Sequence, residues 1–359
     1  MTLREDLLRE FCPQNALELE RDLALLHRSS GGEGFVDAIA RLQEFVGAGT
    51  VRHYPHTDAC QGYLMPRPWN LKGGSLRLST GEWLVPDLRN APIGGVFLSG
   101  ASRGVERLTV VDVGSGTEDP DYAQPVEGCA VLATGKPPVV YREAVMSRGA
   151  RCVISDFMPV QDARIGRTPD EMPDAVSYTS FGAESGGEGF GFNVSSHTFK
   201  RLQDMAGKET VQVDAFFDAD AGTGDLQLLE AHAGTPGARK PLLLQAHLCH
   251  PRPGANDNAS GAALLAELVR VLRKVPLERE VIALWMPEFY GTIAWLADQK
   301  PDLACAIDLD MVGEDQAETC STLEVTATPW SLPSFIPNLM AVNLASHDFR
   351  LMLTGFTWG

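Results

Sequence analysis

The chain has 359 residues, of which 44% are apolar and 21% are charged, and its net charge at pH 7 is −17. The negative charge argues against nucleic acid or an anionic membrane as a main partner, because phosphate groups would be repelled. No stretch approaches the ~18–20 apolar residues that span a bilayer. The composition is compatible with a peptide or a small molecule as substrate, although solubility alone is the more ordinary explanation of the negative charge.

The first 85 residues are expected to be mainly helical. Residues 1–14 mix acidic and basic residues with leucines, which is typical of an amphipathic helix and not of a signal peptide. Helical spacing of apolar residues predicts further helices over 16–27 and 34–46. Residues 54–74 are rich in aromatic residues, proline and glycine, which suggests irregular structure. The seven cysteines form no CxxC pair, so we expect a reducing, cytoplasmic setting.

Residues 86–205 differ in residue pattern from the stretch before them. Short β-like runs alternate with glycine, aspartate and proline, and only about one helix is indicated. The predicted strands lie at 95–98, 108–113, 129–133 and 152–155, and the predicted helix lies at 139–148. The pattern indicates a small β-rich unit inserted into a larger domain.

Residues 206–359 alternate between strand and helix. Such alternation predicts an α/β sheet covered by helices on both faces. Functional residues of these sheets gather where the strands end. The predicted strands are 211–217, 226–231, 241–246, 281–286 and 304–309, and the predicted helices are 259–274 and a segment starting at 292.

The string LLLQAHLCHPRPGANDNASG, residues 242–261, is the first candidate site. An apolar strand ends at His247, with His250 close behind, and Asp257 stands just before a helix that Asn258 or Ser260 can cap. Imidazole nitrogen and carboxylate oxygen together are suitable ligands for Zn²⁺. A strand before the string and a capped helix after it make a metal site more probable than a solvated loop with surface histidines.

Two further strand ends carry carboxylates. Glu288 follows the apolar run 281–286, where an acid either pairs with a cation or serves as a base. Asp308 and Asp310 alternate with apolar residues and should face the same side of their strand; Asp310, nearer the strand's end, is the better metal ligand. The same edge of the sheet is therefore expected to collect all these groups.

The succession of GANDNASG, a strand-end glutamate and LDMVG resembles the co-catalytic di-zinc aminopeptidases, and the AHLCHP and PEFxGT strings resemble a bacterial aminopeptidase-like branch of that family. The resemblance implies an α/β fold of the three-layer α/β/α zinc-exopeptidase type with a mixed sheet. It also implies one or two zinc ions and hydrolysis of an N-terminal peptide bond or a related amide. By the same resemblance His247 and Asp310 ligate one metal and Asp257 bridges two. Glu288 matches the position of an acidic pair in the family, and we favour it as the general base, because a metal-bound water otherwise has no proton acceptor. His250 could substitute as a ligand.

Residues 111–155 resemble a protease-associated (PA) insert, because strand, Asp-Tyr loop, strand, helix, Gly-Ala and strand follow in that order. The predicted division is a helical N-terminal part of the peptidase domain at 1–85, a PA-like insert at 86–205 and an α/β core at 206–359. The family also places a histidine ligand well beyond LDMVG, and nothing here matches it, so the core is expected to be incomplete at its C-terminus.

Other departures leave alternatives open. Cys249 stands where relatives have an aspartate that orients the first histidine, and Pro287 stands where they have the first of two carboxylates. Glu288 could therefore be a ligand instead of the base, and the site could hold one metal or two. The chain could also hydrolyse a non-peptide amide such as a secondary metabolite, or be a degenerate binding protein without catalysis. A homo-oligomer remains open as well.

Overall fold

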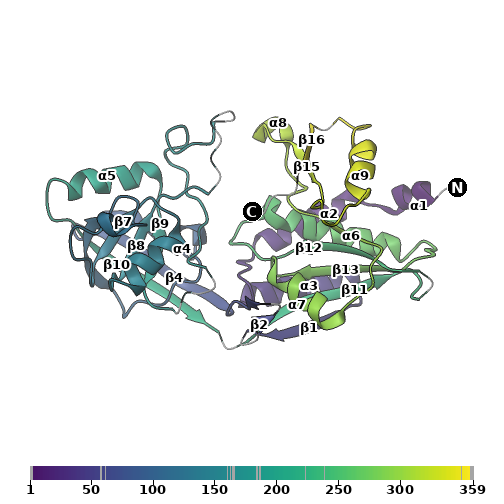
Figure 1. The fold of residues 1–359 in the computed structure, drawn as a ribbon, viewed down its shortest axis with the longest axis horizontal. Helices are drawn as coiled ribbons and strands as arrows, with labels where there is room; N and C mark the ends of the chain where they lie inside the picture. The colour runs from purple at the N-terminus through teal and green to yellow at the C-terminus, as the bar shows by residue number, and fades with distance from the viewer. Residues whose placement is uncertain are drawn as a thin grey trace.

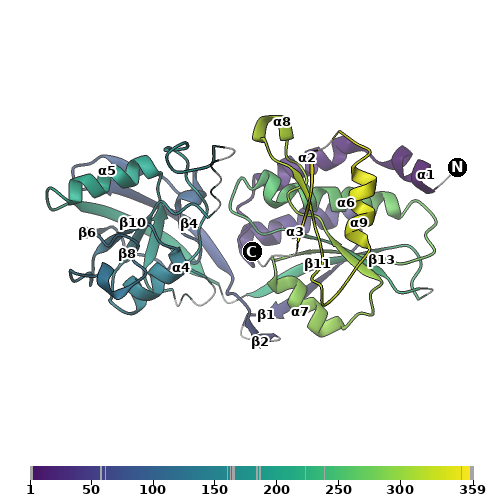
Figure 2. The ribbon, with the colours of Figure 1, turned by 45° about the horizontal axis from the view of Figure 1, so that its top comes forward.

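The computed structural model describes residues 3–56, 59–60, 62–159, 161, 163, 166–182, 185, 187–222, 224–237, 239–348 and 350–355. These residues form two lobes that lie side by side, each built on its own sheet (Figures 1 and 2). Among the described helices, none is both long enough and apolar enough to cross a membrane.

The first lobe is built on a five-stranded mixed sheet with the order β1-β11-β13-β12-β14. β1 and β11 are antiparallel to their neighbours, whereas β13, β12 and β14 run parallel to one another. The carboxyl ends of these three parallel strands therefore meet at one edge. The strands are β1 (Thr50–Pro55), β11 (Asp225–Ala233), β12 (Leu242–His247), β13 (Val281–Met286) and β14 (Cys305–Asp308).

Helices cover both faces of this sheet. The side chains of Leu229 and Ala231 in β11 pack with buried residues of three helices on one face. Leu228, which points the other way, packs with Trp295 on the opposite face. Figure 1 shows α6 above the sheet and α7 below it. The predicted three-layer α/β/α arrangement with a mixed sheet is confirmed. The helices of the first face are α2 (Pro13–Ala24), α3 (Glu33–Val46) and α6 (Gly261–Leu272); α7 (Tyr290–Gln299) covers the other face, and α1 (Leu3–Glu10) precedes α2.

The second lobe is built on a seven-stranded sheet with the order β5-β4-β10-β6-β7-β8-β9. Strands β6 to β9 are parallel, and β10 is antiparallel to both β4 and β6. The elements are β4 (Trp69–Leu78), β5 (Trp83–Val85), β6 (Glu106–Asp112), β7 (Ala130–Ala133), α4 (Pro137–Val140), the π-helical η3 (Tyr141–Met146), β8 (Cys152–Ser155), β9 (Phe190–Asn193), α5 (Ser196–Ala206) and β10 (Gln212–Ala221).

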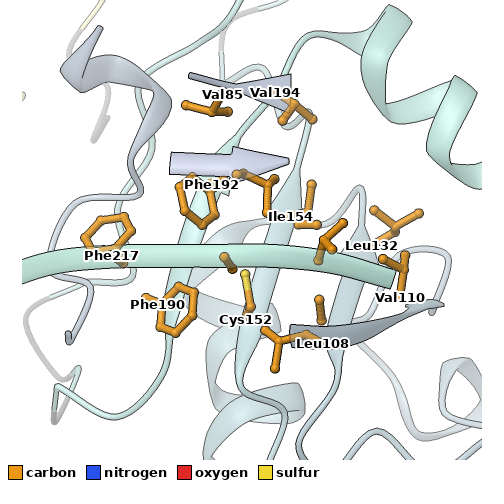
Figure 3. Packing of buried hydrophobic residues seen from close by; sticks show 14 of the residues in the cluster. Val85, Leu108, Val110, Leu132, Cys152, Ile154, Phe190, Phe192, Val194 and Phe217 are labelled. Carbon is orange, nitrogen blue, oxygen red and sulfur yellow. The ribbon is translucent and has the colours of Figure 1, made fainter. Parts of the chain in front are cut away.

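Three phenylalanines anchor the core of the second lobe (Figure 3). The ring of Phe217 from β10 lies 5.8 Å from that of Phe190 and 5.4 Å from that of Phe192, both in β9. All three rings are almost completely buried. Aromatic side chains bury large apolar areas, so this cluster is a main source of stability for the lobe.

The seven-stranded sheet extends on both sides of the 86–205 range expected for the insert. β4 and β5 come from the stretch expected to be helical, and β10 comes from the stretch expected to be α/β core. β4 also occupies part of 54–74, where irregular structure was expected. Its Gly73 and Gly74 weaken the strand pattern, but pairing with both β5 and β10 holds the segment extended.

The remaining elements are short. Residues 95–98 form no strand and make only isolated bridges at Gly95 and Phe97. The others are β2 (Ala59–Cys60), β3 (Tyr63–Leu64), the 3₁₀ turns η1 (Pro92–Gly94) and η2 (Asp119–Asp121), the π-helical turn η5 (Ala255–Ser260), α8 (Gln316–Thr319), β15 (Leu323–Thr326), α9 (Ile336–Leu344) and β16 (Leu351–Thr354).

Candidate metal centre

Three neighbouring strands deliver the first residues of the site. β12 ends at His247, which is 4% exposed and lies opposite Met286, the last residue of β13. Glu288 follows β13 after one buried proline, and Asp310 follows β14. Because the three strands are parallel, their ends bring these groups to one edge of the sheet, as the sequence predicts.

Asp257 reaches the same edge from the loop after β12. It lies in η5, where its backbone angles (φ −102°, ψ 102°) interrupt the helical path before α6. Asn258 follows it, fully buried, and its side-chain oxygen accepts a hydrogen bond of 3.0 Å from the amide of Gly261. Asn258 therefore meets the prediction that it or Ser260 would cap this helix.

Asn258 also connects two parts of the site. Its side-chain nitrogen donates to the carbonyl of Leu309 at 2.9 Å, and its side-chain oxygen accepts from the amide of Met311 at 3.2 Å. The residue between those two is Asp310. One buried amide thus fixes the turn that carries Asp310 relative to the loop that carries Asp257.

The imidazole of His247 faces two carboxylates. Its Nε2 atom lies 3.2 Å from Oδ1 of Asp257 and 3.2 Å from Oδ1 of Asp310. The second oxygen of Asp257, Oδ2, lies 3.4 Å from Nε2 of His250. Asp257 therefore divides its two oxygens between two imidazoles, and the structure brings together all four residues that the sequence predicts as metal ligands.

Glu288 lies beside the same histidine. Ligand atoms of His247, Cys249 and Glu288 all lie within 4.8 Å of one another, and the amide of Glu288 donates to the Cys249 sulfur at 3.2 Å. The next residue, Phe289, has a φ of 56°, a left-handed conformation that costs energy for a residue with a side chain. A tight turn thus holds Glu288 at the end of β13.

The charges of the site are strongly coupled. Burial alone would lower the pKa of His247, but the neighbouring carboxylates of Asp257 and Asp310 raise it. Burial raises the pKa of Asp308 to about 6, and the neighbouring Asp310 carboxylate adds to the rise. Burial also raises the pKa of Glu288, as do the nearby carboxylates, against the opposing effect of His247.

A divalent cation fits this set of donors. Asp257 Oδ1 and His247 Nδ1 are buried, and neither has a hydrogen bond within the described part of the chain. One N–H group of His247 cannot satisfy two carboxylates at once. The ligand atoms of His247, Asp257 and Asp310 lie within 4.8 Å of one another, and one imidazole with two carboxylates is a donor set that zinc accepts.

The second lobe reaches the site through Tyr178. The Tyr178 ring lies 5.4 Å from that of His250 and 6.0 Å from that of Phe97. The main chain around Phe97 pairs with Thr179, its amide donating to the Thr179 carbonyl at 2.9 Å. Farther along, the guanidinium of Arg252 donates to the carbonyl of Arg89 at 2.8 Å. The loop after β12 thus contacts the other lobe.

Sequence analysis did not identify Tyr178 or Arg28. Arg28, in the link between α2 and α3, is fully buried behind the loop that carries His250. Burial lowers its pKa to about 10, while Cys249 and Asp257 raise it, so the guanidinium stays charged. Arg28 lies outside any strand-end pattern, and no local signal marks it as part of the site.

The sequence profile of a family described as "Domain of unknown function (DUF4910)" matches residues 17–324. A Clostridium acetobutylicum protein, whose description names polysaccharide biosynthesis and an aminopeptidase-like domain, is 27% identical over 134 residues. That match covers 37% of this chain and 27% of the relative, so it spans little more than a quarter of the relative's length.

Solved structures share the fold over nearly the whole chain. A C. acetobutylicum protein assigned as a peptidase has a TM-score of 0.67 at 17% identity, covering 99% of this chain and 68% of its own. BSAP, a zinc aminopeptidase from Bacillus subtilis, has a TM-score of 0.66 at 16% identity, with coverage of 97% and 80%. An aminopeptidase from Aneurinibacillus sp. strain AM-1 has a TM-score of 0.62 at 16% identity, with coverage of 98% and 82%. Identities this low establish the fold alone.

Proposed function

We propose that this chain, which belongs to the family described as "Domain of unknown function (DUF4910)", is a metal-dependent hydrolase that removes N-terminal residues from peptides or cleaves a related amide. The observation that carries the proposal is the approach of Asp257 and Asp310 to one nitrogen of His247, each at 3.2 Å. Two carboxylates share one imidazole nitrogen, and the buried Oδ1 atom of Asp257 has no hydrogen bond among the described residues; a cation would satisfy it.

In this proposal His247, Asp257 and Asp310 hold a zinc ion, and the second oxygen of Asp257, which lies beside His250, offers with His250 a place for a second ion. Zinc, when bound, would supply Lewis-acid activation of a carbonyl and of the attacking water. The number of zinc ions bound per chain will distinguish a centre with one ion from a centre with two.

Glu288 is the proposed general base. Glu288 lies beside His247 but does not belong to the cluster that His247 forms with Asp257 and Asp310. Its carboxylate can therefore accept a proton from water. Its raised pKa, caused first by burial, brings it closer to neutrality, where proton transfer in both directions is efficient. The same group can then deliver the proton to the leaving amine.

The substrate and its setting are also proposals. Peptides are supported by the shared fold with structures named as aminopeptidases. We propose that the β-rich second lobe corresponds to a PA-like insert and contributes to substrate selection, which the contact between Tyr178 and His250 supports. A reducing, cytoplasmic location is compatible with seven free cysteines.

Metal content tests the proposal directly. Elemental analysis should find one or two zinc ions per chain in protein purified without added metal. Asp257→Ala should lose them, because it removes the carboxylate shared by both imidazoles. Asp225→Ala, which changes a more exposed aspartate that lies 3.9 Å from His53, is the matched control and should keep the metal.

The outcome separates the candidate functions. Zinc that is lost only in Asp257→Ala supports the hydrolase and justifies a screen of aminoacyl reporters. Cleavage of other amides, without cleavage of those reporters, would favour the non-peptide hydrolase. Wild-type protein that takes up no metal would contradict the proposal and favour a binding protein without catalysis.

A further inference from the structure

Arg28 is a charged side chain that is 0% exposed and is held almost entirely by main-chain oxygens. Its Nε atom donates to the carbonyl of Leu248 at 2.8 Å, and Nη2 donates to the carbonyl of Gly254 at 2.7 Å. Nη1 donates to the carbonyl of Leu23 at 2.5 Å, at the end of α2. A longer contact of 3.4 Å joins Nη1 to the carbonyl of Pro253.

Apart from Leu23, these acceptors lie at the two ends of one loop. Leu248 follows directly on His247, whereas Pro253 and Gly254 lead into η5 and Asp257. The loop between them contains His250. A single planar guanidinium, whose donors point in fixed directions, therefore spans the segment that carries His250 and that His247 and Asp257 flank, and joins it to α2.

The main chain of Arg28 also holds this loop. Its amide donates to the carbonyl of His250 at 3.0 Å and its carbonyl accepts from the amide of His250 at 3.0 Å. Gly254 leaves the space that the guanidinium needs. A Cβ atom on Gly254 would lie 2.9 Å from Nη2 of Arg28 and 2.6 Å from Nδ1 of His250. His250 is thus positioned by Arg28 through backbone pairing and through the loop that the side chain closes.

Holding the charge here is costly. In the part of the chain that the structure describes, no carboxylate forms an ion pair with Arg28. A buried charge needs its hydrogen bonds to be complete, and here the loop carbonyls supply them. Charge and loop conformation therefore depend on each other, since a loop that moved away would leave the guanidinium without acceptors.

We propose that Arg28 is a positioning residue that preorganises residues 248–257, so that metal binds to a site already formed. This inference rests on the proposed function for its consequence, the metal affinity. The loop order itself can be measured in protein without metal.

The test compares Arg28→Lys with the wild-type chain. A lysine keeps the positive charge but is a compact donor on a flexible stem, so it cannot reach both ends of the loop. We expect hydrogen exchange of amides in 248–257, measured by mass spectrometry without metal, to become at least about tenfold faster, as the loss of a hydrogen bond to a charged group implies. Zinc affinity should fall by about 10- to 100-fold, as for other groups that support metal ligands.

Arg273→Lys is the matched control. Arg273 also donates to several main-chain carbonyls, those of His232 and Ala48 at 2.9 Å each and that of Val46, but none lies in the metal loop. The control should change neither loop exchange nor zinc affinity. Arg28→Met removes the charge as well and, if it folds, should show a larger effect than Arg28→Lys.

The two measurements separate the two proposals. Unchanged exchange of 248–257 in a folded Arg28→Lys protein would overturn the role of Arg28, whatever the metal result. Faster loop exchange with wild-type zinc affinity would also overturn it, because the loop order would not then matter for binding. A wild-type chain that binds no zinc would contradict the proposed function, while the exchange data would still decide whether Arg28 orders the loop.

Discussion

The side-chain oxygen of Asn258 accepts a hydrogen bond of 3.2 Å from the main-chain amide of Met311. This contact crosses from the loop after β12 to the turn after β14. Met311 has a φ of 49°, a conformation that side-chain-bearing residues adopt only when their surroundings hold them there. Asn258 therefore helps to maintain a strained turn beside Asp310, and the spacing of the two aspartates depends on it.

Asn258→Ala should destabilise the protein and weaken the metal centre. It leaves the carbonyl of Leu309 and the amides of Gly261 and Met311 without their partner, which costs about 3 kcal/mol. Zinc affinity should fall by about 10- to 100-fold. Thermal unfolding and zinc titration check both effects. Asn256→Ala is the control, because it removes one hydrogen bond, to the amide of Gly313, and equal effects in both variants would contradict this role of Asn258.

Glu288→Gln should separate catalysis from metal binding. The amide keeps the size of the side chain but cannot accept a proton from water, so kcat should fall by about 10²- to 10⁴-fold while zinc content stays unchanged. Activity assays and elemental analysis on the same preparation provide the check. Glu278→Gln, at a solvent-exposed ion pair with Arg239, should behave as wild type. Loss of zinc in Glu288→Gln would instead make Glu288 a ligand.

Tyr178 should act on the site through its ring and not through its hydroxyl. Tyr178→Ala removes the contacts with His250 and Phe97, each worth about 0.5–1.5 kcal/mol beyond area burial, and should lower both the unfolding temperature and zinc affinity. Tyr178→Phe keeps a ring in contact with both His250 and Phe97 and should match wild type in unfolding temperature and in zinc affinity. If Tyr178→Phe were as impaired as Tyr178→Ala, the hydroxyl would be the important group.

Stability should fall in acid because of Glu230. Burial alone would raise its pKa, but hydrogen bonds from His232, Arg52 and Trp295 hold it far below its ordinary value. A carboxyl whose pKa is lower in the folded state stabilises the fold above its unfolded value, about 4.3. That contribution is lost as pH falls further. Unfolding temperatures measured from pH 6 to 3 should therefore drop more steeply for wild type than for Glu230→Gln.

The same network acts in the opposite sense at higher pH. The pKa of His232 is raised, first by its hydrogen bond to Glu230 and, after opposing desolvation, by Glu280. A base with a raised folded-state pKa stabilises the fold below its unfolded value and loses that contribution as pH rises. Glu230→Gln should thus also flatten the decline in unfolding temperature above pH 6.5. Parallel profiles for both proteins would contradict the role of this network.

Much of the α/β lobe could be predicted from the sequence, because its information is local. The run 281–286 coincides with β13, and the predicted strand 241–246 differs from β12 (Leu242–His247) by one residue at each end. Buried strands are continuous apolar runs, and each ends where a polar residue follows. Because β12, β13 and β14 are parallel, their carboxyl ends meet at one edge of the sheet. His247, Glu288 and Asp310, which stand at or just after those ends, therefore lie together there.

The limits of the second lobe could not be predicted in the same way. β4 contains Gly73 and Gly74, and its stability comes from pairing with β10, some 140 positions later in the chain. Composition changes near residue 86, but hydrogen bonding across the sheet does not stop there. A strand that is stabilised mainly by pairing with its neighbours need not have the local residue pattern from which a strand is predicted.

By itself, the sequence determined which groups stand at the strand ends and therefore which donors a metal could meet, because strand periodicity and capping act over a few residues. Only the tertiary structure decided that Asp257 shares its oxygens between two imidazoles, that Tyr178 lies on His250, and that Arg28 closes the loop from behind. Arg28 and Leu248 are 220 positions apart. Their contact forms only when the two segments are buried together. A buried charge needs hydrogen-bond acceptors, and which carbonyls provide them is decided by the folded chain.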